Sequence, residues 1–257
     1  MAFAILITCL VILFWGYYHS WWTQMKFPQS PRILMYHMVE APELPLEKPN
    51  LAVSPKEFEK QIKWLKENGW QFVTISELLR KKDQSKTIAI TFDDGYKNNL
   101  TNALPILASY GAKATLYLIA GGQSVNQNPH PSALLLSDEQ VTEILNSGLI
   151  ELGAHSFTHR NLKTSDEASR QYELAFTKNS LEERFGKTIS SFAYPFGQFD
   201  LALAEMVEKE KYESAVTTNK GISTDLQKDR FYLKRIRISG KDNLSQFKTK
   251  IKTGEKK

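Results

Sequence analysis

The chain has 257 residues, a formal net charge of +5 and a composition that is 42% hydrophobic and 24% charged, so it can form one barrel-sized domain or two smaller ones. Its single cysteine, Cys9, excludes internal disulfides and thiolate metal clusters, so a metal site would need His, Asp or Glu ligands. The interior has no basic run interleaved with aromatic residues, which argues against a nucleic-acid partner.

The chain begins with an uncharged apolar run, Ala2 to Tyr18, that is followed by aromatic residues. The run is short for a transmembrane helix, but it can cross a membrane with its flanking tryptophans at the interface. It has no basic start and no small-x-small cleavage site, so we expect residues 1–22 to be an anchor or an uncleaved signal. Lys26 and Arg32 after the run weakly favour a cytoplasmic catalytic domain.

After a linker at residues 23–31, short apolar segments alternate with amphipathic ones. The apolar segments are rich in β-branched or aromatic residues and mostly close at Gly, Pro or polar residues, which predicts strands. They lie at residues 32–39, 70–75, 87–94, 113–120, 149–156, 189–195, 212–218 and 232–238.

Helices are predicted between these strands. The sequence SPKE at residues 54–57 is a capping box with proline at the first helical position, and its helix ends at Gly69. A second helix opens with SDEQ at residues 137–140 and ends near Gly148, and a longer one covers about residues 165–186. Alternating strands and helices indicate a parallel α/β fold, either a barrel or a doubly wound sheet, with ligands at the carboxyl ends of the strands.

Polar residues interrupt the pattern at those strand ends. Asp93 and Asp94 follow one strand, and neighbouring carboxylates on a strand point to opposite sides, so one can bind a metal while the other acts as a base. Alone, their DDG sequence would be an ordinary turn. His155 and His159 are spaced to meet on one face of a helical turn. Two His and one Asp would leave a metal open to water and substrate.

Together these residues resemble the polysaccharide deacetylase family, carbohydrate esterase family 4, also called the NodB-homology domain. TFDDG at residues 91–95 matches its first motif and HSFTH at residues 155–159 matches its second. The resemblance spans roughly residues 32–240 and implies a distorted (β/α)₇ barrel. We therefore expect one catalytic domain at residues 32–247, followed by a basic, solvated tail at residues 248–257.

The resemblance also implies roles for these residues. Asp93 would be the general base, while Asp94, His155 and His159 would hold a divalent metal, most often zinc and sometimes cobalt or nickel. The implied reaction is hydrolysis of an N-acetyl group from an amino sugar of a glycan. The chemistry agrees, because a metal polarises the amide carbonyl and a carboxylate accepts the proton of the attacking water.

The family's third motif, Arg-x-Pro-Tyr, is only partly present, because the segment here reads Ala193 to Phe196. By the resemblance, the N–H of Phe196 stabilises the oxyanion, and Tyr194 is a candidate substrate contact. The motif arginine, which would hold the base carboxylate, is missing. Arg235 is the candidate replacement, with Arg237 as the alternative, and a surface ion pair is an equally good interpretation of either.

The family's carboxyl-terminal Leu-x-His, which supplies the general acid, is absent, since no histidine follows His159. The chain is then either a degenerate binder or takes its acid from elsewhere. The sequence MYHMV at residues 35–39 resembles the permuted subgroup that deacetylates poly-β-1,6-N-acetylglucosamine of biofilm matrices. By that likeness His37 is the general acid, although a lone histidine in an apolar strand would otherwise be a core residue.

We therefore expect a membrane-anchored, metal-dependent N-deacetylase, with poly-β-1,6-N-acetylglucosamine as the favoured polymer and an extracytoplasmic catalytic domain. Peptidoglycan, chitooligosaccharides and lipopolysaccharide sugars are the alternative substrates. A non-catalytic glycan-binding module, and an interaction protein of a polysaccharide synthase or export complex, are alternatives from other classes.

Overall fold

The computed structural model describes residues 25–41, 49–124 and 133–255. The expected membrane segment at residues 1–22 lies outside the described residues, as do residues 23 and 24 of the linker. Within the described parts of the chain, the helices are all too short or too polar to cross a membrane.

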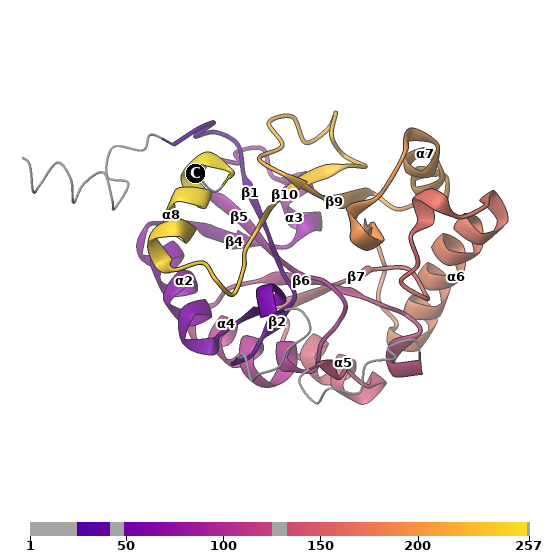
Figure 1. Cartoon of the computed structure of the whole chain (residues 1–257), viewed down its shortest axis with the longest axis horizontal. Coiled ribbons are helices and arrows are strands. Elements are labelled where there is room, and N and C mark those ends of the chain that lie inside the picture. Colours follow the sequence, from indigo (N-terminus) through magenta and orange to yellow (C-terminus); the bar gives the residue numbers. More distant parts are fainter. Residues whose placement is uncertain (1–24, 42–48, 125–132, 256–257) are drawn as a thin grey trace, which may run out of the picture.

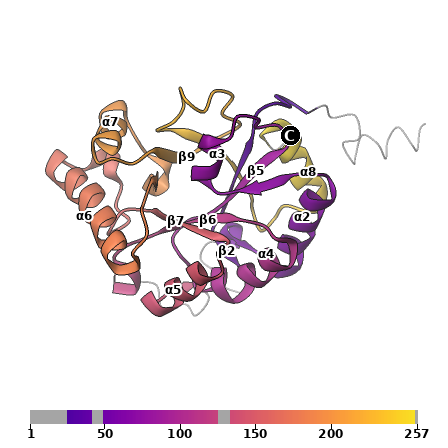
Figure 2. The ribbon, with the colours of Figure 1, turned by 180° about the vertical axis from the view of Figure 1, so that it is seen from behind.

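A closed ring of parallel strands forms the centre, and helices surround it (Figures 1 and 2). Each predicted strand segment overlaps an observed strand. In ring order these are β1 (Arg32–Tyr36), β10 (Leu233–Arg237), β9 (Ser214–Lys220), β8 (Ser191–Ala193), β7 (Ile150–Ala154), β6 (Ala114–Leu118) and β5 (Thr87–Phe92). β4 (Gln71–Val73) pairs with the start of β5 outside the ring, and β2 (Met38–Val39) pairs with β3 (Ala52–Val53). The predicted (β/α)₇ barrel is confirmed.

The ring closes through β1, which pairs with β5 on one edge and with β10 on the other. Tyr36 is the register partner of Phe92, and Met35 is the partner of Arg237. The carboxyl ends of these three strands therefore lie side by side although they are far apart in the sequence. The first strand of the described chain thus adjoins the last.

The predicted helices are present, with helix starts that follow from their capping residues. Ser54 accepts the Glu57 N–H at the start of α2, and Ser137 and Gln140 form a complete capping box at α5. The α-helices are α2 (Pro55–Glu67), α3 (Ile75–Arg80), α4 (Leu104–Tyr110), α5 (Asp138–Asn146), α6 (Glu167–Phe185), α7 (Leu201–Lys209) and α8 (Leu244–Thr253). Single turns lie at η1 (Pro49–Leu51), η2 (Asn99–Ala103), η3 (Gly122–Ser124), η5 (Leu162–Thr164) and η6 (Pro195–Gly197).

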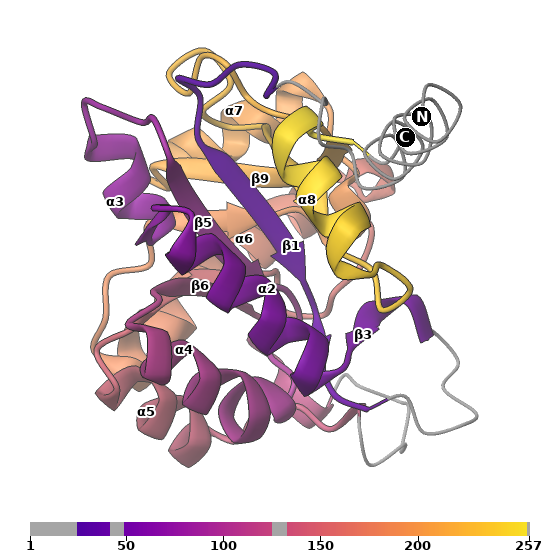
Figure 3. The ribbon, with the colours of Figure 1, turned by 90° about the vertical axis from the view of Figure 1, so that its left-hand side faces the viewer.

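The predicted solvated tail at residues 248–257 is wrong up to Thr253, because these residues complete α8. Figure 3 shows α8 lying beside β1 and α2. Ile251 is fully buried, and its carbonyl accepts the Nε–H of buried Arg32 at 2.7 Å. Phe247 and Ile251 are four residues apart, so both face the core while the lysines between them mask the pattern.

This packing predicts that the last helix contributes to stability. Ile251→Ala should lower the free energy of unfolding by about 2–5 kcal/mol, since it removes a buried side chain and leaves a cavity. The measurement is urea denaturation of the purified protein. Glu255→Ala, in the same predicted tail but exposed, is the matched control and should change that free energy by less than about 0.5 kcal/mol. Equal effects of the two substitutions would mean that α8 is not part of the folded domain.

Candidate active site

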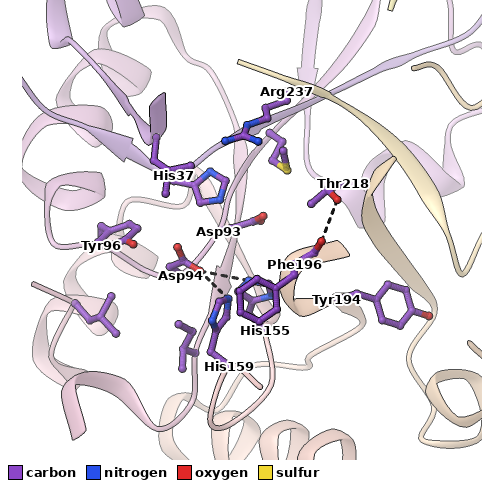
Figure 4. A pocket seen from close by; sticks show the side chains of 14 residues that line it. His37, Asp93, Asp94, Tyr96, His155, His159, Tyr194, Phe196, Thr218 and Arg237 are labelled. Atoms are coloured by element: carbon purple, nitrogen blue, oxygen red, sulfur yellow. Dashed lines mark hydrogen bonds and ion pairs between the residues drawn. The ribbon is translucent and has the colours of Figure 1, made fainter. Parts of the chain in front are cut away.

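A cavity of about 410 Å³ opens at the carboxyl ends of the barrel strands (Figure 4). The structure brings nearly all of the sequence-predicted site residues to it. Its lining includes His37, Asp93, Asp94, His155, His159, Tyr194, Phe196 and Arg237. Arg235 is not part of this lining and lies behind Asp93, fully buried.

Arg235, and not Arg237, holds the Asp93 carboxylate. Its two terminal nitrogens donate to the two oxygens of Asp93 at 2.6 and 2.7 Å, and its Nε–H donates to the Thr217 carbonyl at 2.8 Å. Burial opposes ionisation of Asp93, but the charge and hydrogen bonds of Arg235 outweigh it, so the pKa of Asp93 lies below its usual value. Asp93 is therefore a fixed, ionised carboxylate at neutral pH.

Asp94, His155 and His159 present one donor atom each to a common point. The Nε2 atoms of both histidines lie 3.4 Å from Oδ1 of Asp94. Bonds of about 2.1 Å to a tetrahedral ion would place neighbouring ligand atoms roughly 3.4 Å apart. The spacing and the nitrogen and oxygen donors therefore fit a divalent cation.

Hydrogen bonding fixes which nitrogen of His155 faces this point. Its Nδ1 lies 2.7 Å from the Ala193 carbonyl, which accepts a proton from that nitrogen and leaves Nε2 unprotonated when the ring is neutral. A carbonyl behind a histidine is the usual support for a metal ligand. Sequence reasoning missed the role of Ala193 because every residue has a backbone carbonyl, so the residue type does not indicate it.

The HSFTH segment is not the helical turn that the spacing of its histidines suggested. Ser156 and His159 have positive φ angles of 60° and 57°, and the Ser156 hydroxyl accepts the His159 N–H at 3.0 Å. Buried Glu173 of α6 accepts the N–H groups of Phe157 and Thr158 at 2.7 and 3.0 Å. The histidines meet because this folded turn brings them together.

Backbone strain concentrates at the site. Asp94 and Phe196 also have positive φ angles, of 74° and 59°, and such angles are costly for residues with a side chain. Two neighbouring glycines are required by space as well as by φ. A Cβ on Gly95 would lie 2.3 Å from Leu118 Cδ1, and one on Gly197 would lie 2.4 Å from the Thr218 nitrogen.

The electrostatics of Asp94 and His159 suit a cation. Burial raises the pKa of Asp94. The hydrogen bond from His155 and the nearby imidazoles lower this pKa by more than burial raises it, so it lies well below its usual value. Burial, together with the nearby His155, lowers the pKa of His159 to about 4. Asp94 is thus ionised and His159 neutral at pH 7, which are the forms that bind metals.

His37 directly follows β1 and stands over the carboxylates. Its imidazole points toward Asp93 and Asp94 from the side opposite the metal-site histidines (Figure 4). The Asp93 N–H donates to the Tyr36 carbonyl at 3.0 Å, and Asn99 of η2 donates to the His37 carbonyl at 2.9 Å, which fixes the backbone there. Burial lowers the pKa of His37, although Asp94 and Asp93 partly offset this.

Phe196 and Tyr194 differ in position. The Phe196 ring is exposed, and its centroid lies 4.8 Å from that of His159. Tyr194 is fully buried, points away from the cavity in Figure 4, and donates its hydroxyl to the Phe231 carbonyl at 2.9 Å. Tyr194 thus borders the cavity while its side chain points into the core, and its predicted role at the substrate stays a prediction.

Tyr96 also lines the cavity and was missed by sequence reasoning. Burial, the charge of Asp94 and a hydrogen bond to it raise the pKa of Tyr96 well above its usual value. Tyr96 therefore remains a neutral phenol beside the carboxylate. Tyr96 lies only two residues after Asp94 in the sequence, and this proximity could have indicated that it lines the site.

Comparison with known proteins agrees with this geometry. The sequence profile described as polysaccharide deacetylase matches residues 80–215. The chain is 33% identical over 225 residues to YxkH of Bacillus subtilis (strain 168), which carries a provisional polysaccharide deacetylase name, and the match covers 86% of this chain and 75% of YxkH. The chain belongs to the polysaccharide deacetylase family. Enzymes of this family are hydrolases that in general depend on a metal.

Two further members show the range of the similarity. Poly-β-1,6-N-acetyl-D-glucosamine N-deacetylase of Staphylococcus aureus (strain MRSA252) is 31% identical over 209 residues, covering 74% of this chain and 69% of that protein. The crystal structure of BC0361, a polysaccharide deacetylase from Bacillus cereus, is 31% identical with a TM-score of 0.75, covering 87% of this chain and 69% of that one. The resemblance read from the motifs is thus confirmed.

The site geometry predicts which substitutions remove a bound cation. Asp94→Ala, His155→Ala and His159→Ala should each weaken binding of added Zn²⁺ by at least about tenfold, because each removes one of three protein ligands. Asp93→Asn is the matched control and should retain binding, since Arg235 holds Asp93 away from the donors. Titration calorimetry measures binding, and circular dichroism checks folding. Loss of Zn²⁺ by a folded Asp93→Asn but not by Asp94→Ala would reverse the two roles.

Proposed function

We propose that this deacetylase hydrolyses the N-acetyl groups of N-acetylglucosamine units in a polysaccharide, with a divalent metal, most suitably zinc, at Asp94, His155 and His159. The observation that carries the proposal is the division of labour between adjacent carboxylates. Arg235 holds Asp93 with two hydrogen bonds, and the two histidines face Asp94. One cavity thus combines a fixed base with a three-donor cation site.

The residues then have separate tasks. A bound cation supplies Lewis acidity toward the acetyl carbonyl. The Asp93 carboxylate accepts a proton from the water that attacks the amide carbon, and Arg235 keeps that carboxylate oriented. The backbone N–H of Phe196 donates to the oxyanion that develops. The Thr218 hydroxyl supports this N–H by donating to the Phe196 carbonyl at 3.1 Å, which fixes the turn.

His37 supplies the proton that the leaving amine requires. An amine leaves readily only when its nitrogen is protonated, and among the described histidines only His37 faces the site without belonging to the donor set. Its lowered pKa favours the neutral ring before substrate binds. His37 must therefore take up its proton during the catalytic cycle, and the adjacent carboxylates favour that protonated form.

Poly-β-1,6-N-acetylglucosamine is the favoured polymer, supported by the similarity to the S. aureus enzyme that is named for it. Peptidoglycan, chitooligosaccharides and lipopolysaccharide sugars are the alternative glycans. The complete set of Asp and His donors favours an enzyme over a glycan-binding module, because binding a glycan does not require a cation site that is open to water.

The proposal predicts release of free amine from at least one member of a glycan panel. Chelator should abolish that release, and added Zn²⁺ or Co²⁺ should restore it. Fluorescamine labelling of new amino groups measures the reaction, with Asp94→Ala as the negative control. Binding to a glycan without amine release, in metal-loaded protein, would favour the glycan-binding alternative. Amine release that persists in chelator would exclude the metal-dependent reaction.

His37→Ala should lower the turnover of that amide substrate by about 10²–10⁴-fold, the usual effect of a positioned proton donor. An acetate ester of the same sugar should be affected less, since an alkoxide leaves more readily than an amine anion. Zn²⁺ binding and the melting temperature should stay near those of the wild type. Near-normal amide turnover in the folded variant would return His37 to a structural role.

We further propose that residues after Lys26 lie outside the cytoplasm, anchored by the apolar run at residues 2–18, beside the machinery that synthesises or exports the polysaccharide. An enzyme reaches a matrix polysaccharide only outside the cytoplasm. This constraint outweighs Lys26 and Arg32, whose positive charges weakly favour a cytoplasmic domain. Alkaline phosphatase fused after Lys257, which leaves α8 intact, should be active in whole cells. Fluorescence of a green fluorescent protein fusion that folds only in the cytosol would contradict this location.

A further inference from the structure

A second cavity, of about 520 Å³, adjoins the catalytic one. Arg237 lines both cavities, so they meet at its side chain. A third cavity of about 240 Å³ shares Lys220 and Glu255 with the second. The second and third cavities together are called the basic groove here. This groove leads away from the catalytic cavity between the ends of β9 and β10 and the end of α8.

The groove is strongly cationic. Its basic lining residues are Lys26, Lys220, Lys234, Arg237, Lys241 and Lys250, and its acidic ones are Asp242 and Glu255. Lys250 forms an ion pair with Asp242, which neutralises both. Lys220, Arg237 and Lys241 are exposed, and their side chains make no ion pair with another described residue. These three charges remain available to a ligand.

The barrel places these charges beside the reaction. Lys220 and Arg237 end neighbouring strands, and Lys220 is the register partner of Arg235, which holds the base. Figure 4 shows the Arg237 guanidinium at the rim, above His37. A polymer with one sugar in the catalytic cavity would therefore run past Arg237 into the groove. Lys241, before α8, lies farther along it.

We propose that the basic groove binds acidic substituents, carboxylate or phosphate, on the sugars that flank the one being deacetylated. This inference rests on the proposed deacetylase function and specifies its substrate as an acid-substituted N-acetylglucosamine polymer, whatever its linkage. Arg237 forms an ion pair with the acidic substituent nearest the reacting sugar, and Lys220 and Lys241 bind the substituent on the next sugar. Ser239 and Asn50 add neutral hydrogen-bonding groups suited to sugar hydroxyls.

An anionic membrane is the other ligand that such charges could meet. The groove favours a glycan because it is concave and joins the catalytic cavity through a shared arginine, whereas a membrane surface is flat. The charges also separate two functions. The catalytic cavity carries the carboxylates that suit a cation, and the groove carries the cations that suit an acidic chain.

The test compares the double variant Lys220→Gln/Lys241→Gln with the wild-type full chain, both loaded with Zn²⁺. The substrates are a neutral N-acetylglucosamine oligomer and the same oligomer bearing either carboxylate or phosphate groups. The variant should raise KM about tenfold for the acidic oligomers, as expected for losing two exposed charge contacts, and about twofold or less for the neutral one. The acidic oligomer whose KM rises more in the variant shows whether the groove prefers carboxylate or phosphate.

Salt and matched variants check that the effect is electrostatic and local. The difference in KM should vanish in about 1 M salt, where the screening length is about 3 Å. Lys187→Gln removes an exposed lysine outside the groove and should leave every KM unchanged within about twofold. Glu255→Gln removes an acid from the groove and should lower the KM of the acidic oligomers.

Equal KM values of the wild type for neutral and acidic oligomers would overturn the inference while leaving the deacetylase function intact. Deacetylation of none of the oligomers would instead count against the proposed function itself. If the double variant lost affinity for phosphatidylglycerol vesicles but kept the wild-type KM values, the groove would be a membrane contact and the glycan proposal would fall.

Discussion

Closure of the barrel through β1 is the constraint on which the rest of this structure depends. β1 is the first strand of the described chain, yet it pairs with β5 and β10 at once. Because all strands of the ring are parallel, this pairing aligns their carboxyl ends on one rim. The metal-site donors, the base with its arginine, and His37 come from four separate parts of the sequence, and they meet only on that rim.

The buried Arg235 and Asp93 pair decides how the two adjacent carboxylates are used. Removing both charges from water is costly, and the bidentate geometry with additional bonds to Thr91 and Thr217 offsets that cost. The pair takes up both oxygens of Asp93, so Asp94 is left to face the histidines. The arginine reaches this position from the last strand, whereas the family motif supplies it from the segment before Tyr194. The same interaction is thus made from another part of the chain.

The rim is also where the fold tolerates strain. Asp94, Ser156, His159 and Phe196 have left-handed backbone angles, and all four lie in the motifs that form the site. Their turns are held by specific contacts, such as the Glu173 carboxylate under HSFTH and the Thr218 hydroxyl on the Phe196 carbonyl. The regular strands below supply the buried contacts that offset this cost.

The sequence by itself determined a parallel α/β fold, the positions of its strands and the residues of the catalytic motifs, and the barrel followed from the resemblance that those motifs carry. Apolar periodicity and helix caps are local signals, and TFDDG and HSFTH are contiguous, so each can be read within a few residues. The choice of Arg235 over Arg237, the burial of Tyr194, the packing of residues 248–253 and the basic groove were decided by tertiary structure alone. Each depends on which way a side chain faces once strands distant in sequence are paired. Arg235 and Arg237 are two residues apart on β10, and the register of this strand with β1 and β9 decides which of them reaches Asp93.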